Sequence, residues 1–185
     1  ATVAAATIGA SMPVIITRAQ WGADESMRSA APKYSGTIKA AFVHHTVTRN
    51  DYTPEEAAQQ VRNLYGWFTK GLRYSDMAYN FIVDRYGRLY EGRAGGMDRA
   101  VVGGHTAGFN NDTFAVSSLG NFQKTALPAD QLGVVTESVA QLMAWIEDES
   151  PHIESVAAIL PRLDDSMARA RAAILEAMPD LESLS

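Results

Sequence analysis

A strand with alternating character, followed closely by a strongly capped helix, is the feature that most limits how this chain can fold. Residues Ala40–Thr46 read Ala-Ala-Phe-Val-His-His-Thr, and a period of two is typical of a β-strand. His44 therefore shares a face with Phe42, whereas His45 points the opposite way. Such a strand requires further strands beside it in a sheet. The segment that follows it in the chain predicts a helix that covers the sheet.

The predicted helix covers Thr53–Lys70, and signals at both of its ends define it. Thr53 and Glu56 form a Thr-x-x-Glu capping box, and Pro54 suits the first turn. Gly71 is a natural stop. Apolar residues at helical spacing form one stripe, namely Ala57, Val61, Leu64, Tyr65 and Phe68.

Further strands follow this helix. Tyr79–Asp84 and Arg88–Glu91 predict a hairpin around the tight turn Arg85–Gly87. Val101–His105 and Thr113–Leu119 are predicted as two more short strands. A second long helix is then predicted from about Pro128 to Glu147, with its apolar stripe at Leu132, Val135, Val139, Leu142, Met143 and Ile146.

Together these elements predict an α/β fold, a central mixed twisted β-sheet of about five strands flanked by helices. We expect the strand that contains His44 to lie centrally in that sheet. We expect residues 1–16 to be partly disordered or draped on the surface.

The composition changes near residue 147, where Glu147-Asp148-Glu149-Ser150-Pro151 forms a polar break. Beyond it the pattern is helical, contains no glycine and has three arginines against six acidic residues. We therefore divide the chain into an extended N-terminal stretch at 1–16, a domain at 17–147 and an atypical acidic helical tail at 148–185.

Charge and composition exclude several classes of protein. A net charge of −5 disfavours general binding to nucleic acid or to an acidic membrane. The 185 residues contain no cysteine, which excludes disulfide scaffolds, thiolate zinc sites and cysteine nucleophiles. No apolar run approaches the roughly 20 residues that span a bilayer, so no membrane span is predicted.

His44 is the first candidate functional residue. A histidine on a strand beside Phe42 needs a polar partner, and two interpretations remain open. It is either a core histidine satisfied by a hydrogen bond or a metal ligand, because neutral imidazole on a rigid strand suits zinc. His45 faces the other way, so the two adjacent histidines do not form a chelate.

Two further segments carry polar groups that suit a binding site. Tyr79-Asn80 stands at the start of the predicted hairpin, where a tyrosine either packs or acts in catalysis. Gly103-Gly104-His105-Thr106 places two glycines beside a histidine, which allows a ligand to approach closely but is also common in loops. Each of these signals is weak when it is taken alone.

Taken together, they belong to an ordered set of motifs that resembles the peptidoglycan recognition proteins and the related type 2 zinc N-acetylmuramoyl-L-alanine amidases. The resemblance spans about Thr17 to Glu147. The motifs, in the family's order, are Arg18-Ala19-Gln20-Trp21-Gly22-Ala23, Phe42-Val43-His44-His45-Thr46, Asp76-Met77-Ala78-Tyr79-Asn80-Phe81, Gly87-Arg88-Leu89-Tyr90-Glu91-Gly92-Arg93, Gly104-His105-Thr106 with Gly108-Phe109-Asn110, and Ser118-Leu119-Gly120-Asn121-Phe122.

The resemblance implies roles for individual residues. His44 corresponds to the first zinc ligand of the family, and Tyr79 to the tyrosine beside the metal-bound water and the scissile amide. In the family the zinc activates that water, and such a phenol can stabilise the oxyanion. The implied substrate-binding residues are His105, Arg93, Asn110 and Trp67.

The resemblance breaks where the other two zinc ligands should stand. A catalytic zinc needs three protein ligands, and the family takes two from a C-terminal segment with a His and, eight residues later, a Cys or an Asp. The only histidine after His105 is His152, and Leu160 stands eight residues beyond it. We interpret His152 as an exposed residue at a helix start, with zinc ligation as the alternative.

Three functions therefore compete. The first is a zinc amidase that cleaves the bond between N-acetylmuramic acid and L-alanine, with ligands supplied by the tail. The second is a non-catalytic peptidoglycan-binding module, and the third is a chain that does neither because its C-terminal part unseats the sheet. The resemblance implies Zn²⁺ as cofactor, peptidoglycan or a muropeptide as partner, and a secreted or cell-wall associated protein. We expect a monomer, although the sequence does not fix the oligomeric state.

Overall fold

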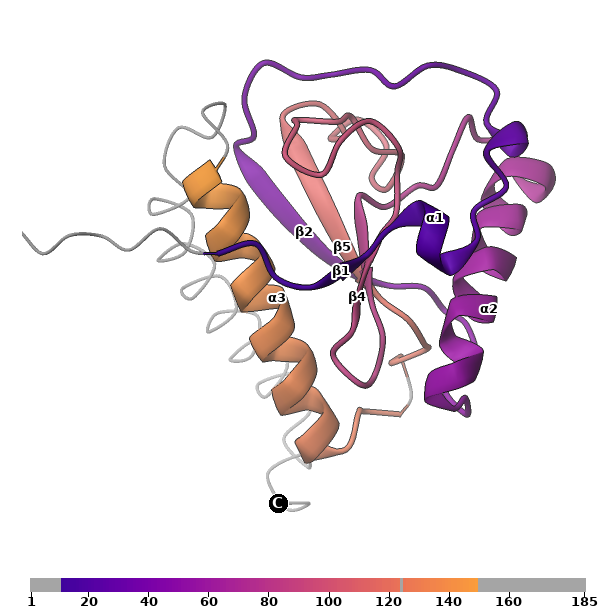
Figure 1. Ribbon diagram of the computed structural model, residues 1–185, viewed down its shortest axis with the longest axis vertical. Coiled ribbons are helices and arrows are strands. Elements are labelled where there is room, and N and C mark those ends of the chain that lie inside the picture. Colours follow the sequence, from indigo (N-terminus) through magenta and orange to yellow (C-terminus); the bar gives the residue numbers. More distant parts are fainter. Residues whose placement is uncertain (1–10, 124, 150–185) are drawn as a thin grey trace, which may run out of the picture. The chain divides into compact units, whose positions relative to one another are not determined.

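The computed structural model describes residues 11–123 and 125–149, and these residues form a five-stranded mixed sheet. The strands lie in the order β1-β4-β3-β5-β2 (Figure 1). β3 and β4 are antiparallel, and all other neighbours are parallel. The strands span Ile15–Ile16 (β1), Ala40–His45 (β2), Phe81–Val83 (β3), Leu89–Glu91 (β4) and Thr113–Ser118 (β5).

Two long helices cover opposite faces of this sheet. α2, at Pro54–Gly66, lies on one side and α3, at Ala129–Glu149, lies on the other (Figure 1). The short helix α1 at Arg18–Trp21 and a single 3₁₀ turn at Glu25–Met27 precede β2. The predicted mixed α/β architecture is thus confirmed.

α2 begins where the sequence predicts, but the α-helix itself ends at Gly66, earlier than the predicted end at Lys70. The backbone N–H of Thr53 donates to Glu56 Oε2 at 2.8 Å, and a π-helical turn at Trp67–Gly71 carries the chain to the predicted stop. The apolar stripe of the helix packs on the sheet. The core that includes this stripe also contains Trp21, Tyr52, Met77, Ile82, Tyr90 and Leu119.

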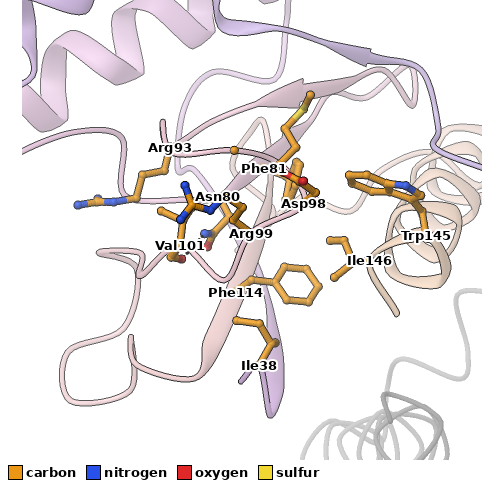
Figure 2. Close-up of a pocket in the computed structure, with 12 residues that line it drawn as sticks. Ile38, Asn80, Phe81, Arg93, Asp98, Arg99, Val101, Phe114, Trp145 and Ile146 are labelled. Carbon is orange, nitrogen blue, oxygen red and sulfur yellow. Dashed lines mark hydrogen bonds between the residues drawn. The ribbon is translucent and has the colours of Figure 1, made fainter. Parts of the chain in front are cut away.

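α3 packs against the opposite face of the sheet. Figure 2 shows Trp145 and Ile146 of this helix facing Phe81 of β3 and Phe114 of β5, with a narrow cavity among them. The free volume of this cavity is about 20 Å³, room for about one water molecule. It is therefore a small gap in the packing of α3 and too narrow for a substrate.

The predicted hairpin of β3 and β4 is confirmed and rests on two features. Gly87 turns the chain with φ +79°, and a Cβ built on it would lie 2.4 Å from Val134 Cγ1 of α3. Asp84 is fully buried, and its Oδ2 accepts hydrogen bonds from Arg88 Nε at 2.7 Å and from the Tyr90 hydroxyl at 2.9 Å. The buried carboxylate is therefore well satisfied at the base of the turn.

The strand that carries His44 lies at the edge of the described sheet, so the prediction of a central position is wrong. Among the described residues, β2 pairs only with β5. β3 and β5 are buried along their whole length, whereas Val43 of β2 is 58% exposed. The alternating pattern of β2 is typical of a strand with one covered face, whereas a continuous apolar run is typical of a central strand.

The prediction of a strand at Val101–His105 is also wrong. Val101 makes one isolated β-bridge, and single hydrogen bonds hold the rest of the segment. Asn80 Nδ2 donates to the carbonyl of Val101 at 2.8 Å, and the N–H of Gly104 donates to the carbonyl of Ala78 at 2.8 Å. These single hydrogen bonds satisfy backbone groups of the segment without pairing it to a neighbouring strand, so the segment follows an irregular path and not that of a β-strand.

Residues 1–16 were expected to be partly disordered or to lie on the surface, and this expectation is wrong for Ile15 and Ile16, which form β1. Ile15 and Ile16 pair in parallel with Leu89 and Tyr90, and Ile15 is buried. Two residues are too few to show a period of two, which is why the sequence pattern did not predict β1. Residues 1–10 lie outside the described part of the chain.

α3 continues to Glu149, so it passes the predicted boundary at 147 by two residues. The predicted tail from residue 150 onward, with His152, lies outside the described residues. Within the residues described, no helix combines the length and the apolar character that crossing a membrane requires.

Candidate functional site

His44 and His105 come together on the side of the sheet that α2 covers. In the sheet register His44 lies opposite Ser117 of β5, and Ser117 lies opposite Ile82, which belongs to the core beneath α2. His105 reaches the same side from the loop between β4 and β5. The distance from His44 Nε2 to His105 Nδ1 is 3.4 Å.

Threonine hydroxyls surround the two imidazoles. Thr106 Oγ1 lies 3.1 Å from His105 Nδ1 and 3.4 Å from His44 Nε2. Thr113 Oγ1 lies 3.4 Å from His105 Nε2 and donates to the carbonyl of Phe109 at 2.5 Å. Because the Thr113 hydroxyl already donates its proton to Phe109, it can only accept from His105, which favours the tautomer of His105 with its proton on Nε2.

Both histidines are held in their neutral form. Burial lowers the pKa of His44, and the neighbouring His45 adds a smaller effect in the same direction. Burial, followed by the nearby His44 and Arg93, lowers the pKa of His105 to about 4. At pH 7 each ring therefore offers one N–H donor and one nitrogen acceptor.

Tyr79 completes this group. Its ring centroid lies 5.6 Å from that of His44 and 5.5 Å from that of Phe68. Burial raises the pKa of the Tyr79 phenol, and the hydroxyl of Ser117 opposes the rise in part. The phenol therefore stays protonated at neutral pH and can donate a hydrogen bond. We refer to His44, Tyr79 and His105 as the histidine–tyrosine cluster.

Arg93 supplies positive charge beside the cluster. Its Nη1 donates to the carbonyl of Met77 at 2.7 Å, and its Nη2 donates to Ser75 Oγ at 3.0 Å. Its Nε is buried with no acceptor among the described residues. The nearest acidic group, Asp76, already pairs with Arg18 at 3.2 Å. The guanidinium is thus held in place mainly by neutral acceptors.

The other two predicted binding residues lie at different distances from the cluster. Asn110 Oδ1 accepts the N–H of Thr106 at 2.9 Å, so this residue shapes the turn that presents His105. Trp67 is 59% exposed and packs over Gly71. In the described part of the chain Trp67 makes no ring contact with the cluster, but its neighbour Phe68 packs against Tyr79 with ring centroids 5.5 Å apart, and the predicted binding role of Trp67 stays a prediction.

Several residues of the site were not singled out from the sequence. Phe42 stacks on His44 with ring centroids 5.8 Å apart and 13° between the planes. Ser117 is fully buried, and its Oγ makes no well-formed hydrogen bond within the described residues. Thr113 and Ser117 lie four positions apart on β5, so a period of two would have placed both on one face.

The donors of the cluster do not by themselves fit a catalytic zinc. Such a zinc takes three protein ligands, and the described residues contain no group of three or more His, Cys, Asp or Glu side chains that could hold a metal. The cluster offers two imidazoles and one phenol, threonine hydroxyls surround it, and no carboxylate is part of it. Third and further ligands would have to come from outside the described residues.

Comparisons with known proteins agree with the fold. Residues 34–161 match the family model described as N-acetylmuramoyl-L-alanine amidase. The chain is 29% identical over 133 residues to peptidoglycan-recognition protein SC2 of Drosophila melanogaster, covering 69% of this chain and 68% of that protein.

Two solved structures are similar over most of the domain. A peptidoglycan recognition protein LE in complex with tracheal cytotoxin, a monomeric diaminopimelic acid-type peptidoglycan, superposes with a TM-score of 0.60 and 28% identity over 76% of this chain and 77% of that chain. Bumblebee PGRP-SA superposes with a TM-score of 0.56 and 29% identity over 70% of this chain and 74% of that chain.

Proposed function

This chain belongs to the N-acetylmuramoyl-L-alanine amidase family, and from that premise we propose that it binds muropeptides, the fragments of peptidoglycan, without hydrolysing them. The histidine–tyrosine cluster and Arg93 are the proposed binding surface. A relative of similar fold is complexed with a monomeric peptidoglycan fragment, which supports this class of ligand.

The chemistry of the cluster suits such a ligand. Neutral His44 and His105 each carry a donor and an acceptor, and Tyr79 carries a phenolic donor, so together they can bind amide and hydroxyl groups. The charge of Arg93 suits a carboxylate of the stem peptide or of muramic acid. Phe42 and Phe68 supply apolar surface on either side of the polar groups.

The donor set is the observation that carries the proposal for binding without hydrolysis. The 185 residues contain four histidines and no cysteine, and His152 is the one histidine among them that follows the cluster. The residue eight positions after His152 is Leu160, which cannot bind zinc. The usual spacing of the second and third zinc ligands is therefore not found within these 185 residues, and the cluster alone does not supply three ligands.

A sedimentation assay with insoluble peptidoglycan tests the proposal. We expect the wild-type chain to co-sediment and to release no muropeptide or free amino group. His105→Gln should weaken co-sedimentation roughly 10-fold, since one good polar contact is worth about that much. His45→Gln is the matched control, because His45 lies on the opposite face of β2. Release of stem peptides by the metal-supplemented chain would contradict the proposal.

A zinc amidase is the second candidate function, and one distance favours it. Two nitrogens bound to the same tetrahedral zinc lie about 3.3 Å apart, close to the 3.4 Å between His44 Nε2 and His105 Nδ1. In this version residues beyond Glu149 complete the ligand set. Zinc content per chain, measured by plasma mass spectrometry after dialysis against trace zinc, decides: a ratio near one favours the amidase, and a ratio near zero favours binding alone.

The proposed ligand also bears on where the protein acts. Peptidoglycan lies outside the cytoplasmic membrane, so a muropeptide-binding domain is proposed to be secreted or associated with a cell wall. Labelling of intact cells with a non-permeant reagent, followed by recovery of this chain, checks that placement.

A further inference from the structure

A cavity of about 180 Å³ lies away from the histidine–tyrosine cluster, beyond the carboxyl end of β5. It is partly open to solvent. Its apolar walls come from Tyr52, Leu119, Phe122 and Pro128, and its polar groups include Asn50 and Arg85. No residue of the proposed muropeptide surface lines it. The carboxyl ends of parallel strands are a common position for ligand sites in open α/β sheets.

Arg85 is fixed in this wall by neutral acceptors. Its Nε donates to Gln131 Oε1 at 2.8 Å, and its Nη1 donates to the carbonyl of Asn50 at 2.5 Å. Asn50 is itself held, because its side chain binds the backbone N–H and the carbonyl of Asn121. In the described part of the chain the second amino group of Arg85, Nη2, has no acceptor.

The charge of Arg85 is not balanced by a carboxylate within ion-pair distance among the described residues. By contrast, the buried Arg18 pairs with Glu25 and Asp76, and the partly exposed Arg88 pairs with Asp84. Asp84 precedes Arg85 in sequence, but it already accepts hydrogen bonds from Arg88, Tyr86 and Tyr90. A cation in this position is a ready partner for an anionic ligand.

The volume limits what that ligand can be. An engineered apolar cavity of about 150 Å³ binds benzene, so a cavity of about 180 Å³ has room for one aromatic ring with a small substituent. Phe122 and Tyr52 supply aromatic surface, and Arg85 supplies the cation. We propose that this cavity binds an aromatic carboxylate, with its ring against Phe122 and its carboxylate on Arg85.

Benzoate and its neutral analogue benzamide are the probes for this proposal. We expect benzoate to bind with a dissociation constant of about 1 mM or below, and benzamide at least 10-fold more weakly. Binding is measured by amide chemical shifts, which should change at Leu119 and Phe122. Inorganic phosphate should bind more weakly than benzoate, because it lacks the ring.

Variants locate the binding. Arg85→Gln should weaken benzoate roughly 10- to 100-fold, the usual range for a lost hydrogen bond to a charged group. Arg62→Gln is the matched control: Arg62 also binds a glutamine and a backbone carbonyl, but it lies on α2 and lines no part of the cavity. Ala126→Phe should fill the cavity and abolish binding, and it decides the question if Arg85→Gln does not fold.

A last pair of probes distinguishes a small free aromatic acid from the carboxyl terminus of a peptide as the ligand. The affinity of acetyl-phenylalanine with a free carboxylate, compared with that of its amide, shows whether the cavity also binds a peptide carboxyl terminus. Binding of benzoate with or without the peptide acid supports the proposal. Equal affinity for benzoate and benzamide, or benzoate binding unchanged in both Arg85→Gln and Ala126→Phe, would overturn it.

Discussion

At the scale of single residues, the stability of this domain depends on a buried ion pair between Arg18 and Asp76. Arg18 and Asp76 are both at least 95% buried, and Arg18 Nη1 lies 3.2 Å from Asp76 Oδ1. Asp76 also accepts the N–H groups of Met77 and Ala94. The pair therefore ties α1 to the segment that leads into β3, next to Tyr79.

Asp76→Ala should destabilise the domain by about 3 kcal/mol, because the buried Arg18 keeps only the half-exposed Glu25 as its partner and the N–H groups of Met77 and Ala94 lose their acceptor. Urea unfolding followed by fluorescence measures the change. Arg49→Ala is the comparison, since the Arg49–Glu56 pair is exposed and its loss should cost about 0.5 kcal/mol or less. Equal effects of the two substitutions would contradict the role given to burial.

The low pKa of His105 predicts a loss of stability in acid. The pKa is about 4 in the folded chain and about 6.5 in an unfolded one, so protonation favours unfolding. The contribution of His105 is fully present above pH 6.5 and is lost as the pH falls towards 4. Unfolding free energies measured across this range should decline less steeply in His105→Gln, and an identical slope would refute the assignment.

At the scale of elements, the sequence predicts best where one local signal decides the structure. The capping box and the stop at Gly71 define α2, and the glycine turn defines the β3–β4 hairpin. Val101–His105 was predicted wrongly because its hydrogen bonds go to Asn80 and Ala78, far away in sequence. The two-residue strand β1 exists only because β4 lies beside it.

Gly87→Ala tests the contact between the hairpin and α3. The new Cβ would lie 2.4 Å from Val134 Cγ1 at a backbone φ of +79°, so we expect a loss of about 1 to 3 kcal/mol. Gly133→Ala should instead stabilise the domain by about 0.5 to 1 kcal/mol, because this glycine lies in α3 with open space around it. Thermal unfolding of both variants checks the opposite signs.

At the scale of the whole molecule, the order of the motifs singles out His44, Tyr79 and His105, and the structure brings these three residues together. Their roles in binding or catalysis stay predictions, and the sequence does not predict their arrangement. The 3.4 Å approach of His44 to His105 depends on the loop between β4 and β5, which no periodicity describes. Trp67 is exposed and packs over Gly71, and its predicted role in binding stays untested by this arrangement.

Shortening the chain to residues 1–149 tests the proposed domain division. Both faces of the sheet are covered by α2 and α3, so we expect cooperative unfolding with a midpoint within about 5 °C of the full chain. The shortened chain should still sediment with peptidoglycan. A broad, non-cooperative transition would instead show that residues 150–185 are needed to hold the sheet together.

The position of β2 at the sheet edge has a consequence for how the domain opens. Among the described residues, a single ladder of parallel hydrogen bonds, to β5, anchors the strand that carries His44. Edge elements open locally at a lower free energy than central ones, so the amides of β2 should exchange with solvent faster than those of β5. A ligand that bridges His44 and His105 can bind only to molecules in which β2 is paired with β5. Its apparent affinity is therefore the intrinsic affinity multiplied by the fraction of molecules in which β2 is paired. Bound ligand should also slow the exchange of the β2 amides, which makes slower exchange a sign of binding.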